Sequence, residues 1–304
     1  MYSRLFKSPP TPKLLREEFE LADGDFVDLA WTEKKETGPI VALFHGLEGS
    51  VDSHYVKVIL NAVINNGWQG ILMHFRGCSG RHNRLNRSYH SGDTGDISFF
   101  IKELIKRYPN RKITAVGISL GGNALIKYMG ELGDKCPLTA AIAISIPFDL
   151  GICAKELETG FARIYQGYLI NSLIKKTRDK FKNKLAPIDL SRLNEWTNFY
   201  SFDHNVTAPL HNFDSVDDYY SKSSCKQFIK HITTPTLILH SKDDPFMNQS
   251  ALPNEDDLSE SVTLELSEQG GHVGFVYGKT PFHPKYWSEK RMAEFFSSAF
   301  NSSL

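Results

Sequence analysis

The sequence has no run of apolar residues that approaches the length of a membrane span, and its N-terminus, MYSRLFKSPPTPKLL, has no apolar signal-peptide core. A membrane-spanning helix needs about 20 mostly apolar residues, and the apolar core of a signal peptide needs about 7 to 15. Internal repeats and low-complexity linkers are absent as well. We therefore expect a cytoplasmic protein with no stable membrane span.

Cysteine is scarce, and neither sign of charge is in excess. The four cysteines are too scattered for a disulfide scaffold or a CxxC metal site: Cys78, Cys136, Cys153 and Cys225. Thirty-five basic and 35 acidic residues give a formal net charge of zero, so there is no electrostatic reason to expect a polyanionic partner such as nucleic acid. We expect no cofactor and no metal ion.

The pattern that is present is that of an α/β protein. Short apolar runs alternate with stretches of helical periodicity, such as residues 96–108, which is typical of a mostly parallel sheet flanked by helices. The first two predicted strands form an antiparallel hairpin across the turn at residues 22–25, and the others belong to βα units. The eight predicted strands span residues 17–21, 26–31, 40–44, 70–75, 112–118, 140–146, 236–240 and 262–266.

One interval between strands is too long for a single helix. Roughly ninety residues separate Ile146 from Thr236, where a few residues and one helix are usual. We predict a single domain over residues 1–304 with an inserted helical cap at about residues 148–231. A helix in the cap, residues 161–174, either packs on its own domain or contacts a lipid surface or acyl chain. Its predicted apolar face, which precedes a basic run at residues 175–180, contains Phe161, Ile164, Tyr165, Tyr168, Leu169 and Ile174.

The sequence Gly117-Ile-Ser-Leu-Gly121 is a G-x-S-x-G motif between an apolar strand and the start of a helix. A sharp turn there strains the serine and exposes its hydroxyl above the sheet, and the glycines remove side chains that would clash. The backbone N–H of Leu120, at the N-terminus of the predicted helix, is placed to stabilise negative charge that develops on a substrate oxygen. We predict Ser119 as a nucleophile; the alternative is a glycine-rich turn with an incidental serine.

A serine hydroxyl needs a base, and eleven histidines compete for that role. His272 is the best candidate because it lies in a glycine-flanked loop, GGHVGF, directly after the last predicted strand. His45 also follows a strand, but we interpret it as a structural histidine that braces its loop. The other nine histidines have no comparable context.

The base in turn needs a carboxylate that orients it. Asp243 and Asp244 follow the strand at residues 236–240, and Pro245 turns the chain away from the sheet edge. The order serine, aspartate, histidine along the chain is that of α/β-hydrolases. The residues alone do not choose between the two aspartates.

Two more loops follow strands at the same edge of the predicted sheet. The run His45-Gly-Leu-Glu-Gly-Ser50 brings backbone close to an acyl oxygen, and we predict the Leu47 N–H as the second oxyanion donor beside that of Leu120. The polar segment at residues 74–81, HFRGCSGR, either shapes the site or forms a salt-bridged loop.

The chain resembles the YheT-like α/β-hydrolases, whose eukaryotic relatives include abhydrolase-domain lipases and yeast medium-chain ester synthases/esterases. The resemblance covers nearly the whole chain, through ADGDFVDLAW, HGLEGS, FRGCSG, YHSGDTGD, GISLGGNALIKY, FDHNVTAPLHNF, TLILHSKDDPFM and GGHVGF. It implies the α/β-hydrolase fold and a Ser-His-Asp triad. In such enzymes the strand is followed by a small residue, two variable positions and the acid, which aligns Ser241 with the small residue and assigns the acid to Asp244.

The resemblance also implies an activity, namely hydrolysis of carboxylic esters with short or medium acyl chains, some of them lipid-derived. Some members transfer the acyl group to an alcohol instead of water, so acyl transfer by the same triad is the alternative. A third interpretation is a non-catalytic ligand-binding module that keeps the fold, but such modules usually lack a triad residue and none is missing here.

Overall fold

The structure is a computed structural model that describes residues 9–277 and 285–301. Within these residues eight strands form one sheet in the order β1-β2-β4-β3-β5-β6-β7-β8. The β1–β2 and β2–β4 pairs are antiparallel, and every pair from β4 to β8 is parallel, which confirms the predicted eight-stranded, mostly parallel sheet. The strands are β1 (Leu15–Glu20), β2 (Phe26–Trp31), β3 (Ile40–Phe44), β4 (Gln69–Met73), β5 (Ile113–Ile118), β6 (Ala140–Ile144), β7 (Thr236–Ser241) and β8 (Val262–Ser267).

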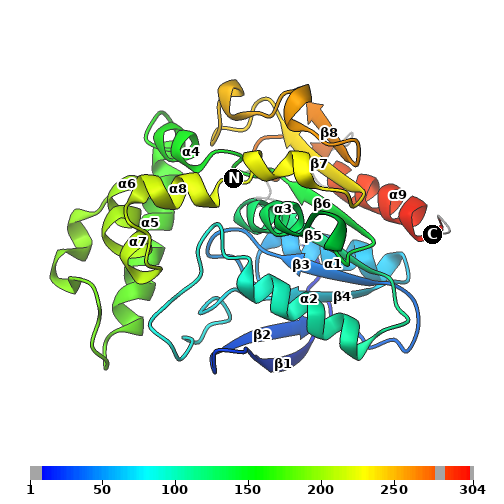
Figure 1. Ribbon diagram of the computed structural model, residues 1–304, viewed down its shortest axis with the longest axis horizontal. Coiled ribbons are helices and arrows are strands. Elements are labelled where there is room, and N and C mark those ends of the chain that lie inside the picture. Colours follow the sequence, from blue (N-terminus) through cyan, green and yellow to red (C-terminus); the bar gives the residue numbers. More distant parts are fainter. Residues whose placement is uncertain (1–8, 278–284, 302–304) are drawn as a thin grey trace.

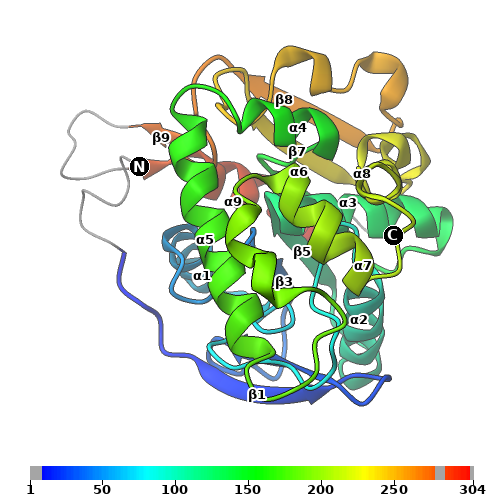
Figure 2. The ribbon, with the colours of Figure 1, turned by 90° about the vertical axis from the view of Figure 1, so that its left-hand side faces the viewer.

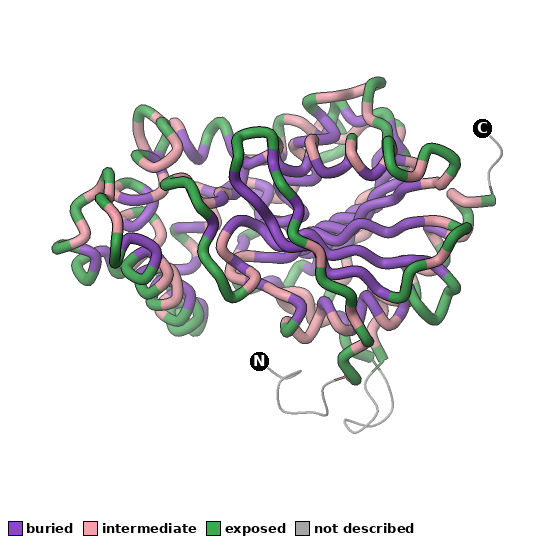
Figure 3. The backbone as a smooth tube through the Cα atoms, turned by 90° about the horizontal axis from the view of Figure 1, so that it is seen from below, coloured by how far each residue is buried: buried purple, intermediate pink, exposed green. Residues whose placement is uncertain are grey.

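Helices cover both faces of this sheet (Figure 1). Helices α2 and α3 pack into one apolar core, and α1 and α9 pack into a second core on the opposite face. Strands β3 to β7 are buried along their whole length, as Figure 3 shows, because both of their faces are covered. The helices outside the cap are α1 (His54–Asn65), α2 (Gly95–Arg107), α3 (Leu120–Leu132) and α9 (Trp287–Asn301).

Two predicted strands are shorter than the apolar runs indicate. The run at residues 70–75 pairs with β3 only as far as Met73, because the backbone N–H of Phe75 turns away to donate to Nε2 of His45. The run at residues 140–146 ends at Ile144, since Ser145 adopts a φ of 50°, which no strand residue can have. The first strand thus ends at a polar contact and the second at a change of backbone conformation.

The segment between β6 and β7 is helical and lies beyond the carboxyl ends of the strands (Figures 1 and 2). Its side chains form two small apolar clusters of their own, and no helix in the described part of the chain is both long and apolar enough to cross a membrane. The elements of this cap are α4 (Leu150–Glu156), α5 (Ala162–Lys180), η3 (Leu190–Glu195), α6 (Phe199–Phe202), η4 (Asp203–Thr207), α7 (Ala208–Leu210), α8 (Val216–Ser223) and η5 (Lys226–His231).

Helix α5 differs from the helix predicted at residues 161–174 in length and in its buried face. It continues through the basic run to Lys180, and the six predicted apolar residues do not share one face. Leu169 and Ile174 are buried, whereas Phe161 and Ile164 are exposed. The prediction was wrong here because the helix packs against the rest of the cap along a neighbouring stripe that includes Ile170.

A short two-stranded sheet lies after β8. Strand β9 (Val276–Tyr277) pairs in antiparallel fashion with β10 (Lys285–Tyr286), directly before α9. The loop that contains His272 therefore lies between β8 and β9, at the edge of the sheet where the parallel strands end.

Candidate active site

Ser119 lies at the turn between β5 and α3, in a strained backbone conformation with φ of 51° and ψ of −121°. Such a conformation in a non-glycine residue costs about 1 to 3 kcal/mol and persists only where the surroundings enforce it. The Ser119 N–H donates to the carbonyl of Ile144 at 2.8 Å, and its carbonyl accepts the N–H of Asn123 at 3.0 Å. Both ends of the residue are thus held, one by β6 and one by the helix.

Close backbone contact explains the glycines of the turn. A Cβ atom on Gly121 would lie 2.4 Å from the carbonyl oxygen of Phe44, and one on Gly117 would lie 2.6 Å from the Cα of Gly122. Neither neighbour is a flexible side chain that could move aside. The absence of a side chain at Gly121 therefore allows the turn to approach the end of β3, and its absence at Gly117 allows β5 to approach the start of α3.

The substitution Gly121→Ala is expected to lower the free energy of unfolding by about 1 to 3 kcal/mol, the usual cost of overpacking a rigid site. Urea unfolding measures the change. Gly167→Ala is the matched control: a Cβ at that position of α5 has no atom within 4 Å, so alanine should leave stability unchanged or raise it by up to about 1 kcal/mol. Equal effects of the two substitutions would contradict the close packing of the turn.

His272 lies between Ser119 and Asp244 and contacts both. The Nε2 atom of His272 is 3.1 Å from the hydroxyl oxygen of Ser119, and Nδ1 is 2.9 Å from Oδ2 of Asp244. Because an ionised carboxylate only accepts hydrogen bonds, Nδ1 carries the proton and Nε2 is free to accept from the serine. The structure thus brings together three residues that are far apart in the sequence.

Asp244 is buried beneath His272. Burial opposes its ionisation, but the electrostatic interaction and the hydrogen bond with His272 outweigh this effect and hold the pKa of Asp244 below its usual value. Its other oxygen, Oδ1, accepts the N–H of Phe246 at 3.0 Å. The carboxylate is therefore charged and fixed in one orientation.

Asp243 points to a different part of the same loop. Its Oδ1 accepts the N–H groups of Gly270 and Gly271, both at 2.8 Å, and makes no contact with the imidazole among the described residues. The two aspartates thus have separate places: Asp244 contacts the ring of His272, and Asp243 holds the backbone that precedes it.

Two serines complete the support of the His272 loop. Ser241 donates from its hydroxyl to the carbonyl of Gly271 at 2.8 Å, and the N–H of Val273 donates to the hydroxyl of Ser145 at 3.0 Å. Val273 has a φ of 63°, which is unfavourable for a β-branched residue. The loop is strained and is held from β6 and β7 together.

In the loop after β3 the N–H groups on both sides of Leu47 have hydrogen-bond partners. Gly46 donates to the hydroxyl of Tyr55, Glu48 donates to the hydroxyl of Tyr89, and Gly49 donates to the carbonyl of Gly46, each at 2.9 Å. The N–H of Leu47 has no partner within the described residues. This pattern supports the oxyanion role predicted for Leu47.

The second predicted donor, the N–H of Leu120, is at the first position of α3. The first N–H groups of a helix have no acceptor within the helix and carry the positive end of its dipole. A Cβ placed on Gly46 would lie 3.3 Å from the Cβ of Ser119, so the two loops are in contact beside the serine. Leu47 and Leu120 thus belong to two chain segments that meet there.

His45 is buried and braces its loop. Its Nδ1 donates to the carbonyl of Gly46 at 2.7 Å, and its Nε2 accepts the N–H of Phe75 at 3.0 Å. Burial lowers the pKa of His45 to about 3, so the ring is neutral at physiological pH. These bonds use both ring nitrogens and leave neither for a substrate.

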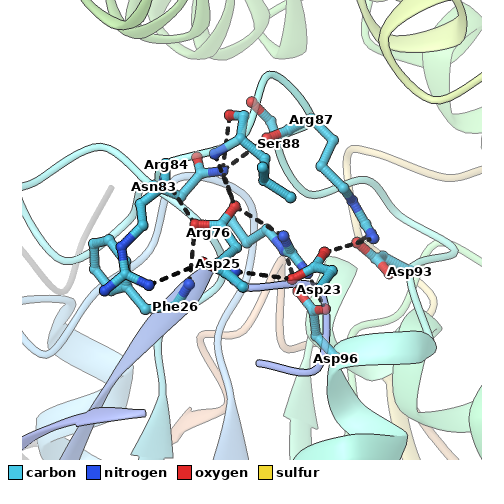
Figure 4. Close-up of polar contacts among 12 residues, drawn as sticks. Asp23, Asp25, Phe26, Arg76, Asn83, Arg84, Arg87, Ser88, Asp93 and Asp96 are labelled. Carbon is cyan, nitrogen blue, oxygen red and sulfur yellow. Dashed lines mark hydrogen bonds and ion pairs between the residues drawn. The ribbon is translucent and has the colours of Figure 1, made fainter. Parts of the chain in front are cut away.

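The segment at residues 74–81 forms a network of ion pairs. The buried guanidinium of Arg76 contacts Asp23 at 2.8 Å, Asp25 at 2.8 Å and Asp96 at 2.6 Å, which links the β1–β2 turn to the start of α2 (Figure 4). Arg81 pairs with Asp28 on β2. Of the two interpretations left open by the sequence, the contacts favour the salt-bridged loop.

Three aromatic or histidine side chains near the site were not expected from the sequence. The ring of Phe246 lies 4.3 Å from that of His272, and the ring of Tyr165 on α5 stacks on Phe246 at 4.7 Å, both between ring centroids. The Nε2 atom of buried His240 lies 3.9 Å from Asp244. Of the three, only His240 could have been found from the sequence, because it lies near the end of a strand and four residues before Asp244.

A cavity of about 80 Å³ adjoins the two predicted oxyanion donors. Its lining consists of Leu47, Leu120, the loop at residues 88–91 and residues of the cap helices. In the described part of the chain, no group of three or more His, Cys, Asp or Glu side chains is placed to hold a metal ion.

The mostly parallel sheet, with a serine on a strained strand–helix turn, is the fold of an α/β-hydrolase. The hydrogen-bonded serine, imidazole and carboxylate have the arrangement expected of a catalytic triad. Comparison with known proteins leads to the same class. The family described as the alpha/beta hydrolase fold matches residues 39–279. The chain belongs to this family and, within it, to the YheT-like esterases.

The individual similarities are as follows. The chain is 40% identical over 307 residues to the Escherichia coli K12 protein named "Putative esterase YheT", covering 98% of this chain and 89% of that protein. It is 27% identical to the human "Phospholipase ABHD3", over 92% of this chain and 71% of the other. Among solved structures, the Pyrococcus furiosus esterase Pf2001 superposes with a TM-score of 0.63 at 14% identity, over 97% of this chain and 98% of the other, a similarity of fold.

Proposed function

We propose that the protein hydrolyses carboxylic esters with short to medium acyl chains, with Ser119 as nucleophile, His272 as base and Asp244 as the orienting acid. The observation that carries the proposal is the unbroken line of hydrogen bonds from the Ser119 hydroxyl through His272 to Asp244, at 3.1 and 2.9 Å. The backbone N–H groups of Leu47 and Leu120 are the proposed oxyanion donors.

The reaction proceeds through an acyl-enzyme. The oxygen of Ser119 attacks the ester carbonyl while Nε2 of His272 takes the serine proton, and the N–H groups of Leu47 and Leu120 stabilise the negative oxygen of the tetrahedral intermediate. His272 then gives the proton to the alcohol that leaves. Water, deprotonated by the same Nε2, releases the carboxylic acid and restores the serine.

Asp244 stays ionised throughout this cycle. Its charge stabilises the imidazolium that forms on His272 and keeps the proton of the resting ring on Nδ1. Its depressed pKa is consistent with this role.

The size of the cavity supports a short acyl chain. Its volume of about 80 Å³ is about half of the ~150 Å³ of an apolar cavity that takes benzene. The cap side chains Val206 and Leu210 are part of its lining. We therefore place the preferred substrate at the short end of the range.

In a panel of p-nitrophenyl esters from acetate to decanoate, kcat/KM is expected to be highest at butyrate or hexanoate and to fall about tenfold or more by decanoate. Leu210→Ala enlarges the cavity and should move the optimum to longer chains. Leu185→Ala, which truncates an exposed leucine of the same cap, is the control and should leave the profile unchanged. A profile that rises steadily to decanoate in the wild-type protein would contradict the assignment of this cavity to the acyl chain.

Acyl transfer to an alcohol requires only that the alcohol replace water in the second half of the reaction. Ethanol added to the assay separates the two outcomes: with hydrolysis the free acid remains the main product, whereas an acyltransferase diverts most of the product to the ethyl ester. The ratio of acid to ester, measured by gas chromatography, gives the partition.

A further inference from the structure

Two sequence motifs that the proposed mechanism does not use meet at the cavity. His90 belongs to YHSGDTGD, between β4 and α2, and His211 belongs to FDHNVTAPLHNF, in the cap. Their rings are in edge contact, with centroids 4.6 Å apart, although 121 positions separate them in the numbering. Both side chains line the same cavity as Leu120, the residue that follows the proposed nucleophile.

The position of His90 is fixed relative to Ser119. Asn123, on the first turn of α3, donates from Nδ2 to the carbonyl of Ser91 at 2.8 Å, and its Oδ1 accepts the N–H of Cys225 at 3.0 Å. The N–H of Ser91 in turn donates to the hydroxyl of Tyr219 at 3.1 Å. The helix that begins directly after the serine therefore holds both the loop of His90 and a segment of the cap.

Both imidazoles are neutral. Burial, reinforced by the positive charge of Arg87, lowers the pKa of His90 to about 3, and burial together with His90 lowers the pKa of His211 to about 2. The N–H of Gly92 donates to Nδ1 of His90 at 3.2 Å, so the ring proton of His90 is on Nε2. Within the described residues, the imidazole of His211 makes ring contacts but no hydrogen bond.

The lysines at the cavity are already engaged. Lys176 pairs with Glu48 at 2.6 Å, and the Nζ of Lys180 donates to Asn83 at 2.7 Å and to the hydroxyl of Ser88 at 3.1 Å. A further bond from Lys180, to a backbone carbonyl, uses its third proton. The charge of Lys176 is thus paired, and burial lowers the pKa of Lys180 to about 7, so neither lysine is a strong site for an anionic substrate group.

The wall at His90 and His211 thus offers neutral N–H donors and a neutral nitrogen acceptor. A hydroxyl group, which both donates and accepts, complements this set. A hydrocarbon in the same place would leave the imidazole N–H groups without a partner and out of water, which is unfavourable. A carboxylate or phosphate would meet no strong cation there, because the charge of Lys176 is paired with Glu48 and Lys180 is only partly protonated near neutral pH.

We propose that His90 and His211 form a recognition site for a hydroxyl group of the ester substrate, so that the protein prefers hydroxylated esters to their plain analogues. The proposal rests on the proposed esterase function. Because the cavity is assigned to the acyl chain, we expect the hydroxyl in the acyl part, as in a hydroxyacyl ester. A hydroxyl of the alcohol part, as in a polyol ester, offers the same chemistry, but it would place the alcohol in the cavity instead of the acyl chain.

Two matched pairs of esters distinguish these sources. Glycerol monobutyrate against propyl butyrate tests the alcohol part, and ethyl 3-hydroxybutyrate against ethyl butyrate tests the acyl part. In at least one pair we expect kcat/KM of the wild-type protein to be about tenfold or more higher for the hydroxylated ester. This preference should fall to near unity in His90→Phe and His211→Phe, whose rings keep the packing.

Two further variants serve as controls for a general loss of folding or of catalysis. His211→Gln retains a hydrogen-bonding side chain and should keep part of the preference. His204→Phe changes an exposed histidine of the same cap segment and should keep all of it. Activity on the plain esters reports the proposed esterase function separately from the preference.

Three results would overturn the proposal: no preference in either pair by the wild-type protein, a preference that survives in both phenylalanine variants, or an equal loss in His204→Phe. If the phenylalanine variants fail to fold, the proposal is judged from the ratio of kcat/KM for the hydroxylated and the plain ester, compared between the wild-type protein and His211→Gln. Absence of activity on all four esters would instead count against the proposed function.

Discussion

Ser119→Ala is expected to lower kcat for p-nitrophenyl butyrate by about 10⁵- to 10⁶-fold, the loss typical of a serine nucleophile in a triad. Without the hydroxyl oxygen no acyl-enzyme forms, although the oxyanion donors and the cavity remain. Steady-state kinetics and labelling with a fluorophosphonate probe measure the loss, and circular dichroism checks that the fold is kept.

Ser250→Ala is the matched control, because Ser250 is exposed and lies outside the site. It should keep both full turnover and full labelling. Labelling that persists in Ser119→Ala would show that another residue carries the nucleophile, and the proposed mechanism would then fail.

Asp244→Asn is expected to lower kcat by about 10⁴-fold while the fold is kept. The amide has nearly the shape of the carboxylate but lacks its charge, so it no longer stabilises the imidazolium of His272. An amide nitrogen toward Nδ1 would also favour the tautomer with the proton on Nε2, which cannot accept from Ser119.

The neighbouring aspartate supplies the matched control. Asp243→Asn keeps a side-chain oxygen that can accept the two N–H groups of Gly270 and Gly271, so turnover should stay within a few-fold of the wild-type value. Asp243→Ala removes that acceptor and should reduce turnover more. A large loss in Asp243→Asn with none in Asp244→Asn would reverse the assignment of the two aspartates.

Much of the fold was predictable because its signals are local. The apolar runs of β3 and β5 to β8 are long enough to identify as strands, and their alternation with helical periodicity predicts a parallel sheet. Strand ends were less predictable. Ser145 ends β6 through its positive φ, and that conformation follows from contact with the His272 loop rather than from the residues beside it.

Helix α5 shows where a local pattern misleads. Apolar residues at residues 161–174 indicate a helix correctly, but which side of it is buried depends on what the rest of the cap presents. The helix buries Leu169 and Ile170, while Phe161 is 89% exposed. Periodicity alone cannot choose between two apolar stripes on one helix.

The residues with the right chemistry are recognisable from the sequence alone, because each belongs to a local pattern: a serine at a G-x-S-x-G turn, a histidine in a glycine-flanked loop and two aspartates after a strand. All of them follow strands whose ends a parallel sheet brings to one edge. The two aspartates, alike in type, are distinguished by their contacts in the fold: Asp244 contacts the ring of His272, whereas Asp243 contacts the backbone that precedes it. The contact between His90 and His211 is likewise visible only in the fold. A contact between a core loop and a cap segment produces no periodic pattern in the sequence of either one.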